Sequence, residues 1–420
     1  RSITPLRFDQ NHIECATFSR NDMGIEQSGS IQGEPKVESL GTLPVRLLRV
    51  RLQERGHHRS PLRRRIAERM RLMPRGMLYT ILAAALLASQ SPVQADPLGP
   101  WPSPAFARGI VYSSWDGSYS NRASWTKDLA YFQQLGVNWI EIMTFAHQPR
   151  VNKPQIKLSS LSRWPTGFVQ AARAQGFRIL LKPHVWSREF YDGSHRWRGS
   201  IRMDTEAQWK RWFEQYEAFI LREAKMAAQH QVEMLSIGLE YVEASKRTAD
   251  WHTLIGKIKK IYPGLLTYAA DGNHELKHIS FWSSLDVIGV DAYFPLADPH
   301  DLLGLSLLWA WLPPLAQLHT LSNRYAKPII FTEAGYPSIL GGTERPWQWP
   351  SGREPVDLRG QALGYQALMG VSTPYPWFRG VFWWKWYEQP EKGVSQAHDY
   401  SPQGKPAEEV LRRWYRQGER

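Results

Sequence analysis

The sequence predicts a (β/α)8 barrel, a single domain in which eight parallel strands form a closed ring and helices cover it on the outside. Two observations support this fold class. From residue 108 onward, short apolar runs alternate with longer helical patterns in eight successive strand–helix units. The runs are also apolar almost throughout, which is typical of parallel strands buried on both faces.

Eight apolar runs are predicted to be the strands, and they span 108–115, 138–145, 177–185, 232–240, 264–271, 286–293, 328–335 and 379–386. Gly136, Gly176 and Gly264 stand at or just before the starts of strands, where a helix has to end and the chain has to turn. The helical patterns between and after the strands span 124–135, 161–175, 204–230, 247–261, 274–284, 307–325, 357–370 and 405–416.

An open, doubly wound parallel sheet is the alternative arrangement of alternating strands and helices. That fold usually carries a glycine-rich phosphate loop after its first strand. Here the first strand leads into Ser113-Ser114-Trp115-Asp116-Gly117, which lacks such a pattern, so the sequence favours the barrel. The longest predicted loop, 338–356, follows the seventh strand and carries Trp347 and Trp349. We expect it to overhang the C-terminal ends of the strands.

Residues 70–95 have the pattern of a secretory signal peptide. Arginines precede the apolar run 77–88, and Val93-Gln94-Ala95 fits the small-x-small cleavage rule. We therefore expect a mature chain that begins at Asp96, comprises the barrel domain 96–420, and is secreted or periplasmic. The apolar run is short for a membrane span, and an uncleaved N-terminal anchor is the alternative.

Residues 1–69 precede this predicted signal and show no hydrophobic period, so we expect them to be disordered. They are either an over-extended reading frame, with translation starting at Met70, Met73 or Met77, or a cytoplasmic tail before an anchor. Cys15, the only cysteine, lies in this segment. The predicted mature chain therefore has neither a disulfide nor a catalytic thiol.

The composition favours a carbohydrate over a nucleic acid as the ligand. The formal net charge is +13, but residues 1–95 alone carry 15 basic and 8 acidic side chains. The remainder is only mildly basic and has no run of Lys and Arg, so nucleic-acid binding is not predicted. The chain also has 20 tryptophans, whose flat faces stack on the apolar faces of sugar rings.

Two predicted strands deliver a glutamate at their C-terminal ends, Glu240 and Glu333. A buried carboxylate is costly unless it is paired, hydrogen-bonded or wet. The C-terminal ends of barrel strands form the active site of such enzymes, and two carboxyls that meet there are the groups that a glycosidase uses. The sequence therefore predicts a glycosidase that needs no metal or other cofactor, with burial raising the pKa of Glu240.

Other polar and aromatic residues gather at the same strand ends. Each of them alone has a structural explanation, such as capping a helix or packing in a wall, but a barrel needs no such set for its stability. Tyr293 is the expected hydrogen-bond donor to Glu333, and His184 is expected to orient a carboxylate or a sugar hydroxyl. The residues predicted to bind the substrate are Trp115, His184, Trp186, Asp271, Asn273, Asp291, Tyr293 and Trp384.

Short motifs in residues 107–416 resemble, in their order and spacing, those of glycoside hydrolase family 113. They are Lys182-Pro183-His184, Ile237-Gly238-Leu239-Glu240, Leu266-Thr267-Tyr268-Ala269-Ala270, Asp286-Val287-Ile288-Gly289-Val290-Asp291-Ala292-Tyr293-Phe294-Pro295, Phe331-Thr332-Glu333-Ala334-Gly335-Tyr336 and Ser401-Pro402-Gln403-Gly404-Lys405-Pro406-Ala407. The resemblance implies a retaining (β/α)8 hydrolase with Glu240 as general acid/base and Glu333 as nucleophile. It also implies a β-1,4-mannan type of polysaccharide or oligosaccharide as the substrate, and Trp384 as the residue that stacks on the sugar. In a regular strand, Trp384 would share its face with Trp386 and not with Trp383.

One position departs from the wider clan of these hydrolases. An asparagine that binds the sugar 2-hydroxyl commonly precedes the acid/base glutamate there, whereas this chain has Leu239, which cannot hydrogen-bond a hydroxyl. Leu239 is therefore the main support for an alternative function, a non-catalytic carbohydrate-binding barrel of the cell envelope. A second alternative is a metal-dependent hydrolase with His147, His184, Asp271 and Asp291 as ligands, but the first strand lacks the pair of histidines typical of such barrels.

Overall fold

The computed structural model describes residues 106–114, 119–158, 164–297, 305–388 and 396–417. The predicted leader, signal peptide, cleavage site and Trp115 lie outside these residues.

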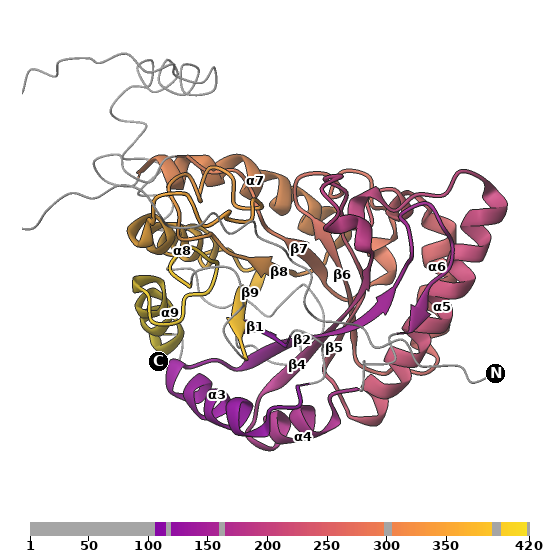
Figure 1. Ribbon diagram of the computed structural model, residues 1–420, viewed down its shortest axis with the longest axis horizontal. Coiled ribbons are helices and arrows are strands. Elements are labelled where there is room, and N and C mark those ends of the chain that lie inside the picture. Colours follow the sequence, from indigo (N-terminus) through magenta and orange to yellow (C-terminus); the bar gives the residue numbers. More distant parts are fainter. Residues whose placement is uncertain (1–105, 115–118, 159–163, 298–304, 389–395, 418–420) are drawn as a thin grey trace, which may run out of the picture. The chain divides into compact units, whose positions relative to one another are not determined.

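Eight parallel strands form a closed barrel, which confirms the predicted fold class (Figure 1). The ring closes because β1 pairs with both β2 and β9. A short strand, β3 (Lys157–Leu158), runs antiparallel to the end of β2 and is not part of the ring. The strands of the ring are β1 (Ala107–Ser113), β2 (Trp139–His147), β4 (Arg178–Trp186), β5 (Met234–Leu239), β6 (Leu265–Asp271), β7 (Ile288–Asp291), β8 (Ile329–Ala334) and β9 (Phe378–Tyr387).

Helices surround the barrel on the outside (Figure 1). Within the described ranges, none of them is both long and apolar enough to cross a membrane. They are α3 (Arg122–Leu135), α4 (Thr166–Ala174), α5 (Glu206–Gln229), α6 (Thr248–Lys259), α7 (Leu305–Tyr325), α8 (Leu358–Ser372) and α9 (Pro406–Gln417). Short 3₁₀ turns occupy the connections at η2 (Arg188–Phe190), η3 (Arg198–Ser200), η4 (Ala244–Lys246) and η5 (Phe281–Ser284).

Local signals in the sequence account for several helix ends. The side chain of Asn121 accepts a hydrogen bond from the Ser124 backbone at the start of α3, at 3.1 Å. Gly136 ends the same helix with a φ of 82°, a left-handed conformation that glycine adopts without strain. Asp357 caps α8 in the same way, because its side chain accepts from the Gly360 backbone at 2.8 Å.

The helix predicted over 274–284 is wrong. Turns and the 3₁₀ segment η5 occupy this connection instead. Side chains satisfy the backbone here in place of helical hydrogen bonds: Asp271 accepts from the backbone amides of Asn273 and His274, at 2.6 and 3.1 Å. The Glu275 carboxylate accepts from the Asp271 amide at 2.7 Å. Such local side-chain bonds compete with helix formation.

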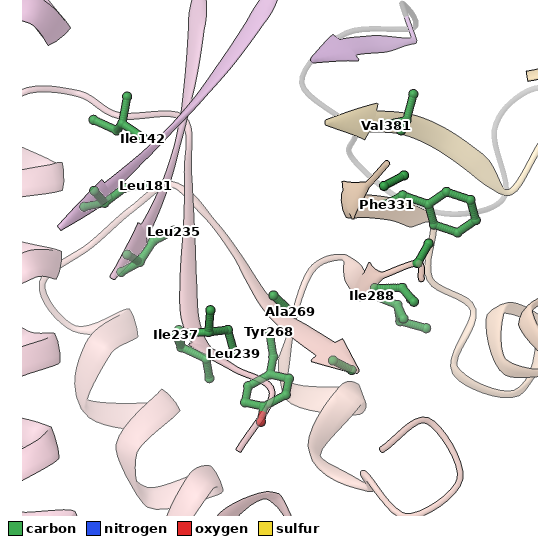
Figure 2. Packing of buried hydrophobic residues seen from close by; sticks show 14 of the residues in the cluster. Ile142, Leu181, Leu235, Ile237, Leu239, Tyr268, Ala269, Ile288, Phe331 and Val381 are labelled. Carbon is green, nitrogen blue, oxygen red and sulfur yellow. The ribbon is translucent and has the colours of Figure 1, made fainter. Parts of the chain in front are cut away.

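Two apolar layers alternate along the strands. The smaller one fills the inside of the ring and includes Trp139, Met143 and Leu180. The larger one lies between the ring and the helices, and Figure 2 shows part of it, including Ile237, Leu239 and Tyr268. The fully buried Leu239 side chain therefore faces the helices and not the inside of the barrel.

Candidate active site

A cavity of about 790 Å³ lies at the C-terminal ends of the strands. Its walls combine acidic, basic and aromatic side chains, which is the composition expected of a site for a polar, ring-shaped ligand. The lining residues are Phe190, Tyr191, His195, Arg196, Trp197, Arg198, Glu240, Asp271, Asn273, His274, Asp291, Tyr293, Glu333, Trp347, Trp349, Trp384 and Tyr400. Both predicted catalytic glutamates are thus brought to one cavity.

Glu333, on β8, is held by two donors. The Tyr293 hydroxyl donates to Glu333 Oε2 at 2.7 Å, as predicted from the sequence, and Lys182 Nζ donates to Oε1 at 2.6 Å. The glutamate is only 3% exposed, so these charge-assisted bonds act in a weakly screening environment. Both contacts fix the carboxylate in one orientation.

Lys182 is the centre of a buried group of charges beneath the cavity. Besides Glu333, its ammonium lies 2.6 Å from Glu141 Oε1, in an ion-pair contact rather than a directed hydrogen bond, and 3.7 Å from Asp291 Oδ1. Burial alone would lower the pKa of Lys182, but the charges of Asp291, Glu141 and Glu333 outweigh it and raise that pKa. The lysine is therefore a permanent cation.

Three carboxyls surround the single ammonium of Lys182, and the pKa values of two of them are raised. Burial raises the pKa of Glu141 to about 8, against the attraction of Lys182. Burial and the charge of Glu333 raise the pKa of Asp291 well above its ordinary value. Asp291 also accepts a hydrogen bond from Thr332 Oγ1 at 2.7 Å. Near neutral pH, part of this group is therefore protonated, which leaves the ammonium available to Glu333.

Glu240 follows the last residue of β5 and has a φ of +50°, a conformation that costs a residue with a side chain about 1–3 kcal/mol. Arg198, in η3, donates to Glu240 Oε2 from Nη2 at 2.7 Å and from Nε at 3.2 Å. Burial raises the pKa of Glu240, as predicted, and the negative charges of Glu333 and Asp271 add to this, while Arg198 opposes it. The two glutamates therefore share a cavity but have different partners.

The other predicted binding residues on β6 and β7 also line the cavity. Asp271 accepts hydrogen bonds from backbone amides of the turn that follows it, and its side chain lies 3.0 Å from His274 Nδ1. Asn273 Nδ2 donates to the Tyr293 carbonyl at 2.9 Å. These bonds hold the turn after β6 against the start of the connection after β7. One wall of the cavity is thereby fixed without a ligand.

His184 and Trp186, which the sequence predicts to bind the substrate, do not line the cavity. His184 is buried edge-on against Phe145, and neither ring nitrogen has a hydrogen-bond partner among the described residues. Burial and the nearby charge of Arg198 lower its pKa well below the usual value, so the ring is neutral. Trp186 stacks on Tyr191, with ring centroids 5.3 Å apart, and it is Tyr191 that reaches the cavity.

Of the three tryptophans on β9, only Trp384 lines the cavity, as predicted. Trp383 stacks on Tyr365 with ring centroids 3.8 Å apart, and Trp386 packs against Phe132, both in the outer apolar layer. Trp384 and Trp386 therefore do not share a face, contrary to the prediction. The reason is an irregularity in the pairing with β1, where Ile110 pairs with Trp383 but Tyr112 pairs with Trp386.

The loop after β8 places Trp347 and Trp349 in the wall of the cavity, as predicted for 338–356. Tyr400 anchors this loop, because its hydroxyl donates to the carbonyls of Pro346 and Gln348 at 2.6 and 3.1 Å. Both tryptophans keep about half of their surface exposed, 51% for Trp347 and 47% for Trp349. Exposed, anchored indoles beside a polar cavity are suited to stacking on sugar rings.

The structure does not support the metal-dependent alternative. Within the residues that it describes, no group of three or more His, Cys, Asp and Glu side chains is arranged to hold a metal ion. The four suggested ligands are separated: His147 lies exposed at the end of β2, and His184 is buried below the cavity that Asp271 and Asp291 line.

A closed barrel with two glutamates at the ends of its strands, facing one cavity, has the architecture of a (β/α)8 glycoside hydrolase. Comparison with known families specifies this class further, since the sequence model described as Glycoside Hydrolase Family 113 matches residues 110–405. The chain belongs to that family and is an O-glycosyl hydrolase.

Solved structures of the same family are similar to the chain. A GH113 β-1,4-mannanase, solved as a complex, has 26% sequence identity and a TM-score of 0.64, over 74% of this chain and 99% of that one. A GH113 β-mannanase from Alicyclobacillus acidocaldarius in complex with ManMIm has 27% identity and a TM-score of 0.62, over 75% and 98% of the two chains. A β-glucuronidase from Faecalibacterium prausnitzii has 14% identity and a TM-score of 0.51, over 74% and 49%, and shares the fold alone. No curated protein gave a significant match.

Proposed function

We propose that the chain is a retaining β-1,4-mannanase in which Glu333 is the nucleophile and Glu240 the general acid/base. The observation that carries this proposal is the pair of buried glutamates in one cavity with contrasting surroundings. Glu333 accepts from Lys182 and Tyr293, and these two donors hold its side chain in the fixed orientation that a nucleophile needs. The raised pKa of Glu240 favours the protonated form that a general acid needs. The mannanases in the same family support the choice of substrate.

The reaction has two balanced steps. In the first, a Glu333 oxygen forms a bond to the anomeric carbon while the bond from that carbon to the leaving oxygen breaks, and Glu240 gives its proton to the leaving oxygen. In the second, Glu240 takes a proton from water. The water oxygen bonds to the anomeric carbon, and Glu333 leaves as a carboxylate. Two inversions at one carbon retain its configuration.

The burial of Leu239 removes the main argument for a non-catalytic carbohydrate-binding barrel. Its side chain is 0% exposed and packs in the outer apolar layer, so the leucine neither adds a group to the cavity nor takes one from it (Figure 2). The groups that face the sugar next to Glu240 come from other elements, among them Arg198 and Asp271.

The substrate is tested by measuring the release of reducing ends from β-1,4-mannan, β-1,4-glucan and xylan by the purified barrel domain. We expect release from mannan to exceed that from the other two polymers. Faster release from glucan or xylan would contradict the substrate, and binding to mannan without any release would favour the non-catalytic alternative.

Trp347→Ala is expected to lower kcat/KM about tenfold on mannooligosaccharides that are long enough to reach the loop after β8. The lost stacking contact corresponds to roughly 1.4 kcal/mol. The shortest hydrolysed oligosaccharide should be affected much less, so the measurement is kcat/KM as a function of chain length. Leu340→Ala is the matched control, because Leu340 is 57% exposed on the same loop but does not line the cavity. An equal loss at every chain length would contradict a separate sugar-binding position.

Export from the cytoplasm is part of the proposal. The signal-like pattern over 70–95 supports a secreted or periplasmic enzyme, and an N-terminal anchor is the alternative. N-terminal sequencing of the exported protein is expected to give a start near Asp96. A start well upstream of the apolar run would instead favour the anchor.

A further inference from the structure

The side chain of Arg198 is in direct contact with the carboxyl that we assign as the general acid/base. Two of its N–H groups converge on a single oxygen, Glu240 Oε2, at 2.7 and 3.2 Å. The two side chains are 18% and 10% exposed, so solvent screens this ion pair only weakly. Arg198 also lines the cavity, where it lies close enough to Glu333 and Asp291 to be influenced by their charges.

The two reaction steps require opposite charge states of Glu240. In the first step it must hold a proton to give to the leaving oxygen, and in the second it must be a carboxylate that takes a proton from water. A guanidinium with two donors on one oxygen stabilises the carboxylate, because a protonated carboxyl forfeits the ion pair. The contact with Arg198 therefore opposes the first step and assists the second.

The other charged groups around Glu240 act in the opposite direction. Glu333 on β8 and Asp271 at the end of β6 both disfavour its negative charge. Glu240 in turn raises the pKa of Glu275, in the turn after β6, and of Asp291 on β7. The ammonium of Lys182 lies against Glu141 and Glu333 instead. The charge state of Glu240 thus depends on the balance between several carboxyls and the guanidinium of Arg198.

We propose that Arg198 is a positioning residue that stabilises the ionised form of Glu240, against the carboxyls around it, and so favours hydrolysis of the glycosyl-enzyme over its formation. This inference rests on the proposed function. Burial among carboxyls favours the protonated form of Glu240, which suits only the first step. The loop residue Arg198 supplies the opposing interaction that the second step requires.

The test compares Arg198→Met with the wild type on two substrates. The first is mannopentaose, whose leaving sugar needs the proton of Glu240, so that kcat/KM reports the first step. The second is a dinitrophenyl β-mannobioside, whose leaving group departs without a proton, so that kcat reports the second step. Loss of the guanidinium raises the pKa of Glu240 further. The basic limb of the kcat/KM profile for mannopentaose is therefore expected to move up by about one pH unit, since a tenfold change in proton affinity is one unit.

The same variant should show a kcat on the aryl substrate about tenfold lower near neutral pH, because less of Glu240 is then ionised to act as a base. Sodium azide should restore this turnover, since azide attacks the glycosyl-enzyme without a base. Azide rescue together with the shifted limb would not result from a general disturbance of the cavity.

Two further variants keep the test decisive. Arg198→Lys retains the charge, and its basic limb should lie between those of the wild type and Arg198→Met. Arg202→Met removes a cation from the same connection, but Arg202 is exposed and does not line the cavity, so the basic limb of this variant should coincide with that of the wild type. An unshifted limb in both Arg198 variants, with equal losses on the two substrates and no azide rescue, would overturn the inference while the proposed function stands. A wild type that hydrolyses neither substrate would overturn the proposed function itself.

Discussion

Glu333→Ala is expected to lower kcat/KM on β-1,4-mannan by a factor on the order of 10⁴ to 10⁶, the range seen when a nucleophile is removed. The loss follows from the geometry, because no other carboxylate in the cavity is held as Glu333 is, by an ammonium and a phenol at 2.6 and 2.7 Å. The measurement is the initial rate of release of reducing ends. Azide added with an activated aryl β-mannoside should occupy the vacated space, attack the anomeric carbon and yield the α-mannosyl azide.

Glu243→Ala is the matched control for this variant. Glu243 lies three residues beyond Glu240, is half-exposed in an ion pair with Lys246, and does not line the cavity. It should keep the turnover of the wild type. If Glu333→Ala retained even a tenth of the activity on mannan, or if azide gave the β-mannosyl azide, the assignment of Glu333 as nucleophile would be wrong.

Lys182→Met is expected to reduce both stability and turnover. Removing one partner of a buried ion pair leaves an uncompensated charge and costs about 3–5 kcal/mol. Here the ammonium contacts Glu141 and Glu333 and lies near Asp291, and all four side chains are buried. We also expect kcat on mannan to fall at least 100-fold, because the cationic donor that orients Glu333 is lost. Urea unfolding at pH 7 gives the first quantity, and steady-state kinetics on the folded fraction give the second.

Lys405→Met separates the two effects. Lys405 is also buried and paired, at 2.7 Å from Asp399, but it does not line the cavity. This variant should lose stability and keep kcat. If Lys182→Met and Lys405→Met had the same kcat, the proposed action of Lys182 on Glu333 would be contradicted.

Glu141→Gln reports on the same buried group through its pH dependence. The pKa of Glu141 is raised in the folded chain from an ordinary 4.5 to about 8. The unfolded chain therefore loses this proton at lower pH than the folded chain, and the wild type loses stability as the pH rises from about 4.5 to about 8. The neutral glutamine avoids this loss. The stability of the variant relative to the wild type should hence increase across that window.

The fold could be predicted from the sequence because the signal for each strand is local. Each barrel strand is a nearly continuous apolar run, and the ends of the observed strands lie within two residues of the predicted ends. The connection 274–284 could not be predicted in this way. Its helical pattern is overridden by Asp271 and Glu275, whose side chains take up backbone amides. That competition depends on a three-dimensional arrangement that no periodicity reports.

The site residues also fall into those that the sequence alone indicates and those that only the fold brings together. Glu240 and Glu333 stand at the ends of apolar runs, where position along the chain already indicates an active site. Glu141 gave a similar signal, a single charge inside the apolar run Trp139-Ile140-Glu141-Ile142, which could have marked it as the partner of a buried cation. Arg198 gave none, because it lies in a connection without regular pattern and reaches Glu240 only through the fold. The arrangement of Trp384 and Trp386 depends on an irregular strand pairing that the alternation rule does not include.

The most direct test of the central claim is proton NMR of the first product released from mannopentaose by the wild-type enzyme. If Glu333 forms a covalent glycosyl-enzyme that Glu240 helps water to hydrolyse, the new reducing end must appear first as the β-anomer, and the α-anomer must follow by mutarotation. Initial appearance of the α-anomer would contradict a covalent route through Glu333, and with it the assigned roles of both glutamates.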